Sequence, residues 1–378
     1  MIKKLLNGFD SMPEQSLASL EGAREEGRKV VGIYCIFAPV EMIRAAGALP
    51  VGLCGKKQEP ISAAEAELPA NLCPLIKSSY GFAITGTCPF FSAADAIVGE
   101  TTCDGKKKMF EAMEKLKPVH LMHLPYNSGM PHSLAFWREE VGRFGEFLQE
   151  LTGNAITTEE LNRQIRIQNR VRSLIRQLHQ ANLGGGGIRV SGRELLAVLE
   201  ARNFWADQVD YAQRLEALVR AMEESPLPPP ANGSRILLTG TPIGKGSDKV
   251  LRLIENSGAT VIAMENCTSL KSAWINVDED TPHPLDAIAR RYLELPCACM
   301  TPNSGRVALL KELAGLYKVD AIVDLTWHAC HTYMVEAHRV GRLMNDDPGL
   351  PVLHLCSDYG ESDLESLRTR IEAFLEII

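Results

Sequence analysis

The part of the chain that most constrains its fold is residues 235–378, where short β-branched apolar segments alternate with longer amphipathic ones. Four segments have the length and composition of buried strands, and helical spacing follows each of them. We expect strands at 235–239, 260–264, 321–325 and 351–355, with helices at 245–257, 284–293, 303–317, 332–344 and 361–378. This alternation predicts a doubly wound parallel sheet.

The N-terminal part repeats the same alternation in a less regular form. Strands are expected at 30–34, 49–53, 94–98 and 118–124, and helices at 13–29 (capped by Ser11), 39–47 and 106–115. Between the two series, apolar residues recur at three- and four-residue spacing, which predicts a helical segment. The sequence LPPPAN at 227–232 has the composition of a stiff linker.

These patterns together predict an α/β fold with two doubly wound parallel-sheet lobes that are joined by a helical segment. The expected domains are an N-terminal α/β lobe, a helical connecting segment and a C-terminal α/β lobe, at 1–132, 133–226 and 233–378. We expect a metal cluster in the cleft between the lobes, for the reasons that follow.

Composition excludes some classes of function. The net charge of −7 provides no basic surface for nucleic acid. We expect no membrane span, because no apolar stretch approaches 18 residues, and no secretory signal, because an apolar core is missing near the start. A cytoplasmic location is therefore expected. In that reducing compartment the ten cysteines are expected to serve metal binding, redox chemistry or packing, and not disulfides.

The cysteines are not scattered evenly along the predicted elements. Six lie at or just beyond the carboxyl end of a predicted strand, and ligands of open α/β sheets bind at that edge. These six are Cys35, Cys54, Cys103, Cys267, Cys330 and Cys356. The other four lie in loops that can reach the same edge, and they are Cys73, Cys88, Cys297 and Cys299. This distribution predicts a cleft lined by thiolates.

The spacing of the cysteines favours one kind of metal site over another. Structural zinc is usually held by paired CxxC motifs, and the only close pair here is Cys297 and Cys299. Isolated cysteines from several strand ends suit an iron–sulfur cluster between lobes better. Zinc and purely structural thiols remain alternatives. For Cys54 and Cys356, whose flanking residues carry little polar chemistry, packing is the favoured interpretation.

Several charged residues are expected beside the cysteines. Glu100 and Glu265 end strands next to Cys103 and Cys267, where a carboxylate could donate a proton, although capping or turn roles are equally compatible. His331 could donate a hydrogen bond to a cluster sulfur or to substrate, or face solvent. Lys106 and Lys107 could screen the charge of a cluster or bind an anionic ligand, or form an ordinary solvated helix face.

Longer blocks of sequence carry a resemblance to a known family. The blocks are PVEMIRAAGALPV at 39–51, NLCPLIKSSYG at 71–81, VGETTCDGKKKMFE at 98–111, ENCTS at 265–269 and ACHTY at 329–333. The chain thereby resembles the 2-hydroxyacyl-CoA dehydratase component D family, which also contains benzoyl-CoA reductase subunits. The resemblance implies a [4Fe–4S] cluster between two α/β lobes, held by Cys73, Cys103 and Cys330.

The chain also departs from ordinary subunits of that family. It carries additional cysteines near the cleft, and we find no CoA-binding signature. This cysteine-rich form is similar to the family's double-cubane cluster proteins, in which three cysteines hold each cubane. That resemblance implies a second cubane on Cys35, Cys267 and one of Cys297 or Cys299, with Cys88 in reserve. It also implies a partner, an ATP-hydrolysing iron–sulfur reductase that donates electrons.

Together these observations predict an oxygen-sensitive iron–sulfur enzyme of anaerobic chemistry. We expect it to form a homodimer and to pass low-potential electrons to a small-molecule substrate. Two alternatives stay open. One is the [4Fe–4S] subunit of a 2-hydroxyacyl-CoA dehydratase, which is a lyase and not an oxidoreductase. The other is an electron carrier that catalyses no reaction of its own.

Overall fold

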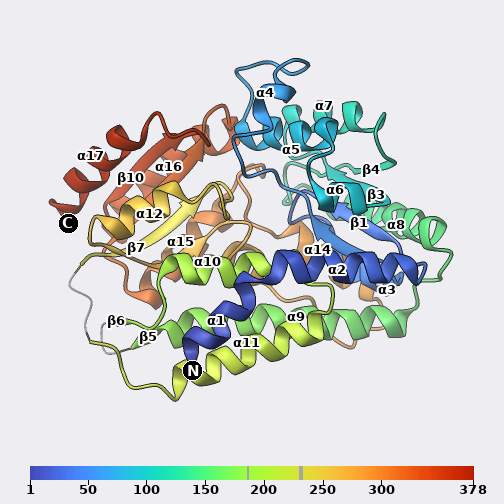
Figure 1. The fold of residues 1–378 in the computed structure, drawn as a ribbon, viewed down its shortest axis with the longest axis horizontal. Helices are drawn as coiled ribbons and strands as arrows, with labels where there is room; N and C mark the ends of the chain where they lie inside the picture. The colour runs from blue at the N-terminus through green and yellow to red at the C-terminus, as the bar shows by residue number, and fades with distance from the viewer. Residues whose placement is uncertain (185–186, 230–232) are drawn as a thin grey trace.

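The computed structural model describes residues 1–184, 187–229 and 233–378. Figure 1 shows an N-terminal lobe in blue and cyan, a C-terminal lobe in yellow to red, and long helices that run beneath both. Each lobe contains a four-stranded parallel sheet. The predicted α/β class and its two parallel-sheet lobes are therefore confirmed.

The N-terminal sheet has the strand order β2-β1-β3-β4. Its strands are β1 (Val30–Ile33), β2 (Leu49–Gly52), β3 (Ala96–Glu100) and β4 (Val119–Met122). All four match predicted strands, with one clear shift of boundary. β3 begins two residues later than predicted, because the preceding residues end a short helix that closes at Ala94.

The C-terminal sheet has the order β10-β9-β7-β8. Its strands are β7 (Arg235–Gly240), β8 (Thr260–Glu265), β9 (Ala321–Trp327) and β10 (Val352–Ser357). Counted within each lobe, both sheets have the order second, first, third, fourth. The winding therefore reverses between β1 and β3 in one lobe and between β7 and β9 in the other. Crevices that bind ligands open at the carboxyl ends of strands at such reversals.

Helices cover the faces of both sheets. In the N-terminal lobe they are α3 (Val40–Ala45), α4 (Ile61–Ala64), α5 (Pro74–Thr85), α6 (Pro89–Ala93) and α7 (Asp104–Met113). From the C-terminal part come α12 (Lys249–Asn256), α13 (Leu270–Ala273), α14 (Pro284–Leu293), α15 (Ser304–Tyr317), α16 (His331–Asp346) and α17 (Leu364–Leu375). The sequence did not predict α5, α6 or α13.

One C-terminal helix packs away from its own sheet. Ile288 and Tyr292 of α14 belong to a buried cluster with Val31 and Val98 of the N-terminal sheet, and α14 also packs against α8 (Ser133–Thr152). The apolar face of α14 is therefore covered by the N-terminal lobe. As a consequence, the segment that follows α14 enters the space between the lobes.

The helical layer consists of α8 (Ser133–Thr152), α9 (Thr158–Asn182), α10 (Gly192–Ala201) and α11 (Gln208–Glu223). α9 packs against α3 of one lobe and α13 of the other, so it bridges both lobes (Figure 1). Ser191 caps α10. Its hydroxyl accepts from the Glu194 amide, and the Glu194 carboxylate accepts from the Ser191 amide, which completes a capping box.

The N-terminus differs from the prediction of one helix at 13–29. Two helices are present, α1 (Ile2–Asp10) and α2 (Met12–Glu25), and α1 packs on α10 and α11. Leu6 and Phe9 form the buried face of α1, which explains why this segment is ordered as a helix. Ser11 lies at the start of α2, but its side chain makes no capping bond.

A short antiparallel pair, β5 (Leu183–Gly184) and β6 (Gly187–Ile188), follows α9, and residues 185–186 between its strands are not described. The linker predicted at 227–232 includes residues 230–232, which are also not described. The domain boundaries therefore stay predictions. Among the helices that are described, none has the length and apolar character that crossing a bilayer requires.

Candidate functional site

A cavity of about 710 Å³ lies where the two lobes and the helical layer meet. The carboxyl ends of β1, β3 and β9 border it, which are the strand ends at the reversals of winding. Eight of the ten cysteines line this cavity: Cys35, Cys54, Cys73, Cys103, Cys267, Cys297, Cys299 and Cys330. The chain thus gathers around one cavity the thiols that its sequence distributes over some 300 residues.

The first cysteine set consists of Cys73, Cys103 and Cys330. Each is the residue immediately before a helix, at the starts of α5, α7 and α16 respectively. A hydrogen bond between the thiols of Cys330 and Cys73 lowers the pKa of Cys73 and raises that of Cys330. Cys103 lies near enough to both for its charge to affect theirs. These three sulfurs therefore share one site.

Burial and helix amides compete at Cys103. The amides of Gly105 and Lys106 favour the thiolate, as expected for a thiol that precedes a helix. Burial has the larger effect and raises the pKa of Cys103 above its ordinary value. The helix terminus alone therefore does not ionise this thiol, and a bound metal would have to supply the remaining stabilisation of the thiolate.

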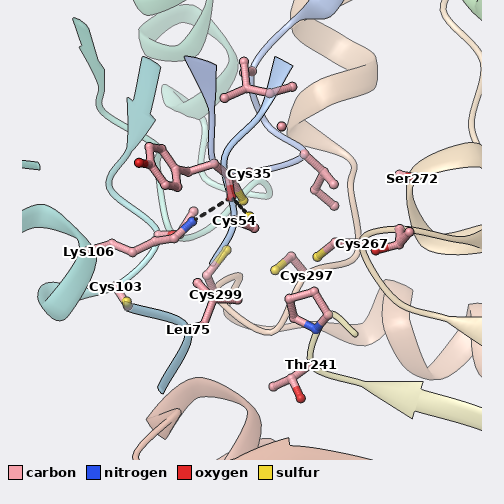
Figure 2. A pocket seen from close by; sticks show the side chains of 18 of the residues that line it. Cys35, Cys54, Leu75, Cys103, Lys106, Thr241, Cys267, Ser272, Cys297 and Cys299 are labelled. Carbon is pink, nitrogen blue, oxygen red and sulfur yellow. Dashed lines mark hydrogen bonds between the residues drawn. The ribbon is translucent and has the colours of Figure 1, made fainter. Parts of the chain in front are cut away.

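The second cysteine set consists of Cys35, Cys267, Cys297 and Cys299, whose side chains converge in Figure 2. The Cys299 thiol donates a hydrogen bond to Cys297, and this bond lowers the pKa of Cys297 to about 6. Burial raises the pKa of Cys267 to about 12. One member of the set is thus ready to ionise near neutral pH while its neighbours keep their protons.

The path of the chain after α14 explains how Cys297 and Cys299 reach the cavity. Because α14 packs beneath the N-terminal sheet, residues 295–300 return toward the C-terminal lobe through the space between the lobes. Cys297 itself belongs to the buried cluster that holds α14 in place. Both cysteines lie in a predicted loop, so only the three-dimensional path fixes their position beside Cys35 and Cys267.

Lys106 extends toward both cysteine sets (Figure 2). It is 7% exposed, and its ammonium donates to the Tyr34 carbonyl at 3.3 Å. Burial disfavours its charge, but the thiols of Cys35, Cys54 and Cys103 and the Glu100 carboxylate raise its pKa overall. Lys106 thus provides a fixed positive charge beside the thiols. Lys107 lies at the exposed edge of the cavity, where it pairs with Asp104 at 2.6 Å.

The arrangement of the thiols distinguishes a cluster from a single ion. Within the described residues, no three His, Cys, Asp or Glu side chains converge tightly enough to hold one metal ion. A cubane places its thiolate ligands on separate irons, so its ligands surround a larger volume. Thiols spaced around a cavity of about 710 Å³ fit that requirement, and they do not fit a tetrahedral zinc site.

The two predicted acids do not line the cavity. Both oxygens of Glu100 are buried without a hydrogen-bond partner among the described residues, and burial, opposed by Lys106, raises its pKa to about 7. Glu265 is fully buried and lies 3.2 Å from Lys271 and 3.5 Å from Arg306 in ion pairs. Glu265 therefore serves an internal network of charges, whereas Glu100 keeps a free carboxyl behind the cavity wall.

The remaining predicted residues occupy three kinds of position. His331 is exposed and lines the cavity at the start of α16. Cys88 does not line the cavity; it precedes α6, where its sulfur accepts from the Phe91 amide at 3.4 Å. Cys356 lies within β10, outside the cavity, and its sulfur is 3.2 Å from Nδ1 of His328.

Cys54 was assigned to packing from the sequence, and the structure places it in the cavity wall. Its thiol donates to the Tyr34 carbonyl at 2.9 Å, the same oxygen that Lys106 contacts (Figure 2). Its position at the end of β2 was the signal that could have identified it, because the other strand-end cysteines of this lobe line the same cavity.

The strand-to-helix turn at 240–246 also borders the cavity through Thr241 and Pro242. Gly240 has a φ of 114°, and a Cβ there would lie 2.0 Å from the Leu325 carbonyl oxygen. Only glycine fits this close approach between neighbouring strands. The turn is therefore a tight connection that faces the cavity.

Comparison with known proteins identifies the family of this chain. The chain is 38% identical to "Putative dehydratase subunit YjiM" of Escherichia coli (strain K12), over 99% of this chain and 98% of that protein. It is 22% identical to the (R)-phenyllactyl-CoA dehydratase beta subunit of Clostridium sporogenes, over 99% of both. It is 23% identical to lactoyl-CoA dehydratase subunit beta of Anaerotignum propionicum, over 94% of this chain and 93% of that protein.

The family model described as "2-hydroxyglutaryl-CoA dehydratase, D-component" matches residues 35–378. That match includes every cysteine of the cavity, from Cys35 to Cys330. The resemblance found in the sequence blocks is thereby confirmed across both lobes. The chain belongs to the 2-hydroxyglutaryl-CoA dehydratase D-component family.

Proposed function

We propose that the cavity holds an iron–sulfur cluster and that the protein delivers low-potential electrons from it to a small molecule. One observation carries this proposal: eight thiols from both lobes line a single cavity at the carboxyl ends of the strands. Packing alone does not explain so many cysteines around one cavity of a cytoplasmic protein, because Ala or Val would fill the same space.

The presence of two cysteine sets favours two cubanes over one. The first cysteine set would hold one cubane through Cys73, Cys103 and Cys330. The second would hold another through Cys35, Cys267 and either Cys297 or Cys299. Cys297 is the preferred third ligand, because its pKa of about 6 makes it the most readily ionised thiol of that set. We leave Cys88 out, since its sulfur is engaged at α6.

When bound, such a cluster supplies single electrons at low potential. The residues of the chain would tune and protect it. Lys106 places a buried positive charge beside the thiolates, and His331 offers a hydrogen-bond donor at the exposed side of the cavity. Glu100, with a pKa near 7, would be the proton reserve behind the wall.

The proposed partner is an ATP-hydrolysing iron–sulfur reductase. A thiolate-rich, buried site disfavours added negative charge and so requires a strong electron donor. This partner, a homodimeric state and a cytoplasmic location all rest on the family resemblance and the composition of the chain.

A second function, that of a 2-hydroxyacyl-CoA dehydratase subunit, is favoured by the printed names of two relatives that align over nearly their whole length. The two functions differ in their need for a thioester. Binding of an acyl-CoA by the purified protein, with dehydration in the presence of a second subunit, would favour the dehydratase. ATP-dependent reduction of a small molecule without coenzyme A would favour the first proposal.

Analysis of iron and acid-labile sulfide in anaerobically purified protein tests the proposed function. We expect Cys103→Ser and Cys330→Ser each to lose most of the bound iron together with the broad visible absorbance. Cys356→Ser is the matched control, because Cys356 lies outside the cavity, and it should keep both. If the first two variants retain iron at the wild-type level, these cysteines are packing residues and the proposal fails.

A further inference from the structure

Besides Arg44, three arginines line the cavity, and we call the part of its surface that they form the arginine wall. Arg172 comes from α9, Arg202 follows the last residue of α10, and Arg291 lies in the last turn of α14. Arg172 and Arg291 are each 4% exposed. Burial, and after it the nearby charge of Arg172, lowers the pKa of Arg291 to about 9, and burial together with Arg172 also lowers the pKa of Arg202.

The charges of this wall are not balanced by the protein. Arg172 forms an ion pair with Glu41, which also accepts from the Tyr292 hydroxyl at 2.7 Å. Among the residues that the structure describes, neither Arg202 nor Arg291 forms an ion pair, although the charge of Glu41 also acts on Arg291. Their bonds go to neutral oxygens: Arg202 donates to Ser272 Oγ at 2.7 Å, and Arg291 to the Ile275 carbonyl at 3.1 Å.

Arg172, Arg202 and Arg291 together face one buried carboxylate, Glu41, which leaves a formal excess of two positive charges among these four side chains. A buried charge without a counter-charge is unfavourable by several kcal/mol in order of magnitude, unless water or a bound ion compensates it. A folded protein that keeps such a group beside a cavity gains stability when an anion enters. The imbalance therefore indicates a binding site and not only a structural network.

A neutral donor completes this wall. Gln168 lies one helical turn before Arg172 on α9, so both side chains project from the same face toward the cavity. It is 5% exposed, and its Nε2 has no hydrogen-bond partner within the described part of the chain. Buried amide donors are nearly always satisfied, so an unpartnered one at a cavity surface points to a ligand acceptor.

We propose that Arg172, Arg202, Arg291 and Gln168 form a subsite for the carboxylate of a small substrate. Guanidinium groups match carboxylates in a planar two-bond geometry, which explains the use of arginine in place of lysine. The subsite shares its cavity with the second cysteine set. Arg202 donates to Ser272, which follows Cys267 by five residues, and Figure 2 shows Ser272 and Cys267 on the same side of the cavity. This inference rests on the proposed function, because it names the class of molecule that would react there.

A carboxylate is favoured over the phosphates of coenzyme A by the depth of the subsite. Two of the three arginines are almost fully covered by protein, so the group that reaches them must be small. A small carboxylate would leave the rest of the cavity for its carbon chain and for the cluster. The arginine wall would also bind inorganic phosphate if it selected only for charge. Comparison of carboxylates with phosphate separates the two possibilities.

Isothermal titration calorimetry on the anaerobic protein tests the subsite. The probes are sodium acetate, sodium glutarate, inorganic phosphate and coenzyme A, each at constant ionic strength because exposed charges are screened by salt. We expect the two carboxylates to bind, and Arg202→Gln to weaken that binding by about ten- to hundredfold, the range for a lost charge-assisted hydrogen bond. Gln168→Leu should weaken it by about tenfold or less.

The matched control is Arg176→Gln. Arg176 lies one turn after Arg172 on the same helix but does not line the cavity, so this variant should bind within about twofold of wild type. Equal affinity of wild type and Arg202→Gln, or failure of both carboxylates to bind, would overturn the subsite. Binding of phosphate or coenzyme A alone would overturn the assignment to a carboxylate.

Iron analysis of the same samples separates this inference from the proposed function. Within the described residues no hydrogen bond joins Arg202 to a cysteine, so Arg202→Gln should keep the iron of the wild type while it loses the carboxylate. Protein without iron that still binds glutarate through Arg202 would uphold the subsite and refute the cluster. Protein that contains iron but shows no binding that depends on Arg202 would uphold the cluster and refute the subsite.

Discussion

Replacement of Glu41 by glutamine is expected to have opposite effects on folding and on anion binding. Glu41 is fully buried, and its two oxygens accept from Arg172 and Tyr292. Burial opposes its ionisation, but Arg172 and Arg291 outweigh burial and lower its pKa below the usual value. Glu41→Gln leaves those guanidinium groups without any carboxylate. Removing one partner of a buried ion pair destabilises a protein by about 3–5 kcal/mol.

The same substitution raises the excess positive charge at the proposed subsite from two to three. Glutarate should therefore bind Glu41→Gln more tightly than wild type, and it should restore part of the lost stability. A ligand present at about 100 times its Kd stabilises the folded state by about 2.7 kcal/mol. At one fixed concentration of glutarate, the variant should recover more free energy of unfolding than wild type gains.

Urea unfolding followed by circular dichroism, with and without glutarate, measures both effects. Because the two lobes could unfold in separate steps, the urea midpoints of wild type and variants are compared for the same unfolding transition. Glu279→Gln is the control: Glu279 accepts from Asn169 at 2.8 Å in the same chain of hydrogen bonds, but it is exposed, so we expect a loss below about 1 kcal/mol. Equal midpoints for the two variants, or weaker glutarate binding by Glu41→Gln, would refute the reasoning.

Two further predictions concern titration and the charge beside the thiols. Burial lowers the pKa of His179 to about 4, so below about pH 6.5 the unfolded chain binds a proton that the folded chain does not. The free energy of unfolding should therefore fall by up to about 3 kcal/mol between pH 7 and pH 4. His179→Gln should flatten that dependence in urea unfolding measured at a series of pH values. An unchanged slope would contradict this. Lys106→Met removes a buried positive charge beside the thiols and should lower the reduction potential in anaerobic spectroelectrochemistry at unchanged iron content; an equal or higher potential would contradict that role.

The strands of both sheets could be predicted because their signals are local. β-branched apolar runs such as 260–264 and 321–325 specify buried strands by composition and length alone. Once those strands are placed in parallel sheets, their carboxyl ends must share an edge, and that geometry brings Cys35, Cys103 and Cys330 to one crevice. Most of the thiol cavity therefore followed from the order of strands along the chain.

The parts that were not predicted depend on contacts between distant segments. The sequence of α14 shows an amphipathic helix, but not that the N-terminal lobe covers it, so the position of Cys297 and Cys299 needed the structure. The arginine wall draws on three helices for the same reason. One signal was present: Gln168 and Arg172 interrupt the apolar face that Ile165, Val171 and Ile175 give to α9. A polar pair one turn apart on a buried face indicates an internal polar site.

We propose that the two cysteine sets each hold a cubane in one cavity. The iron content of a Cys35→Ser/Cys267→Ser double variant tests this most directly. Wild type should contain about eight irons per chain, and the double variant about four, because the second cubane loses two of its three anchors. Far-ultraviolet circular dichroism at the wild-type level would show that the loss does not come from unfolding. Retention of the full iron content by the folded double variant would contradict the claim.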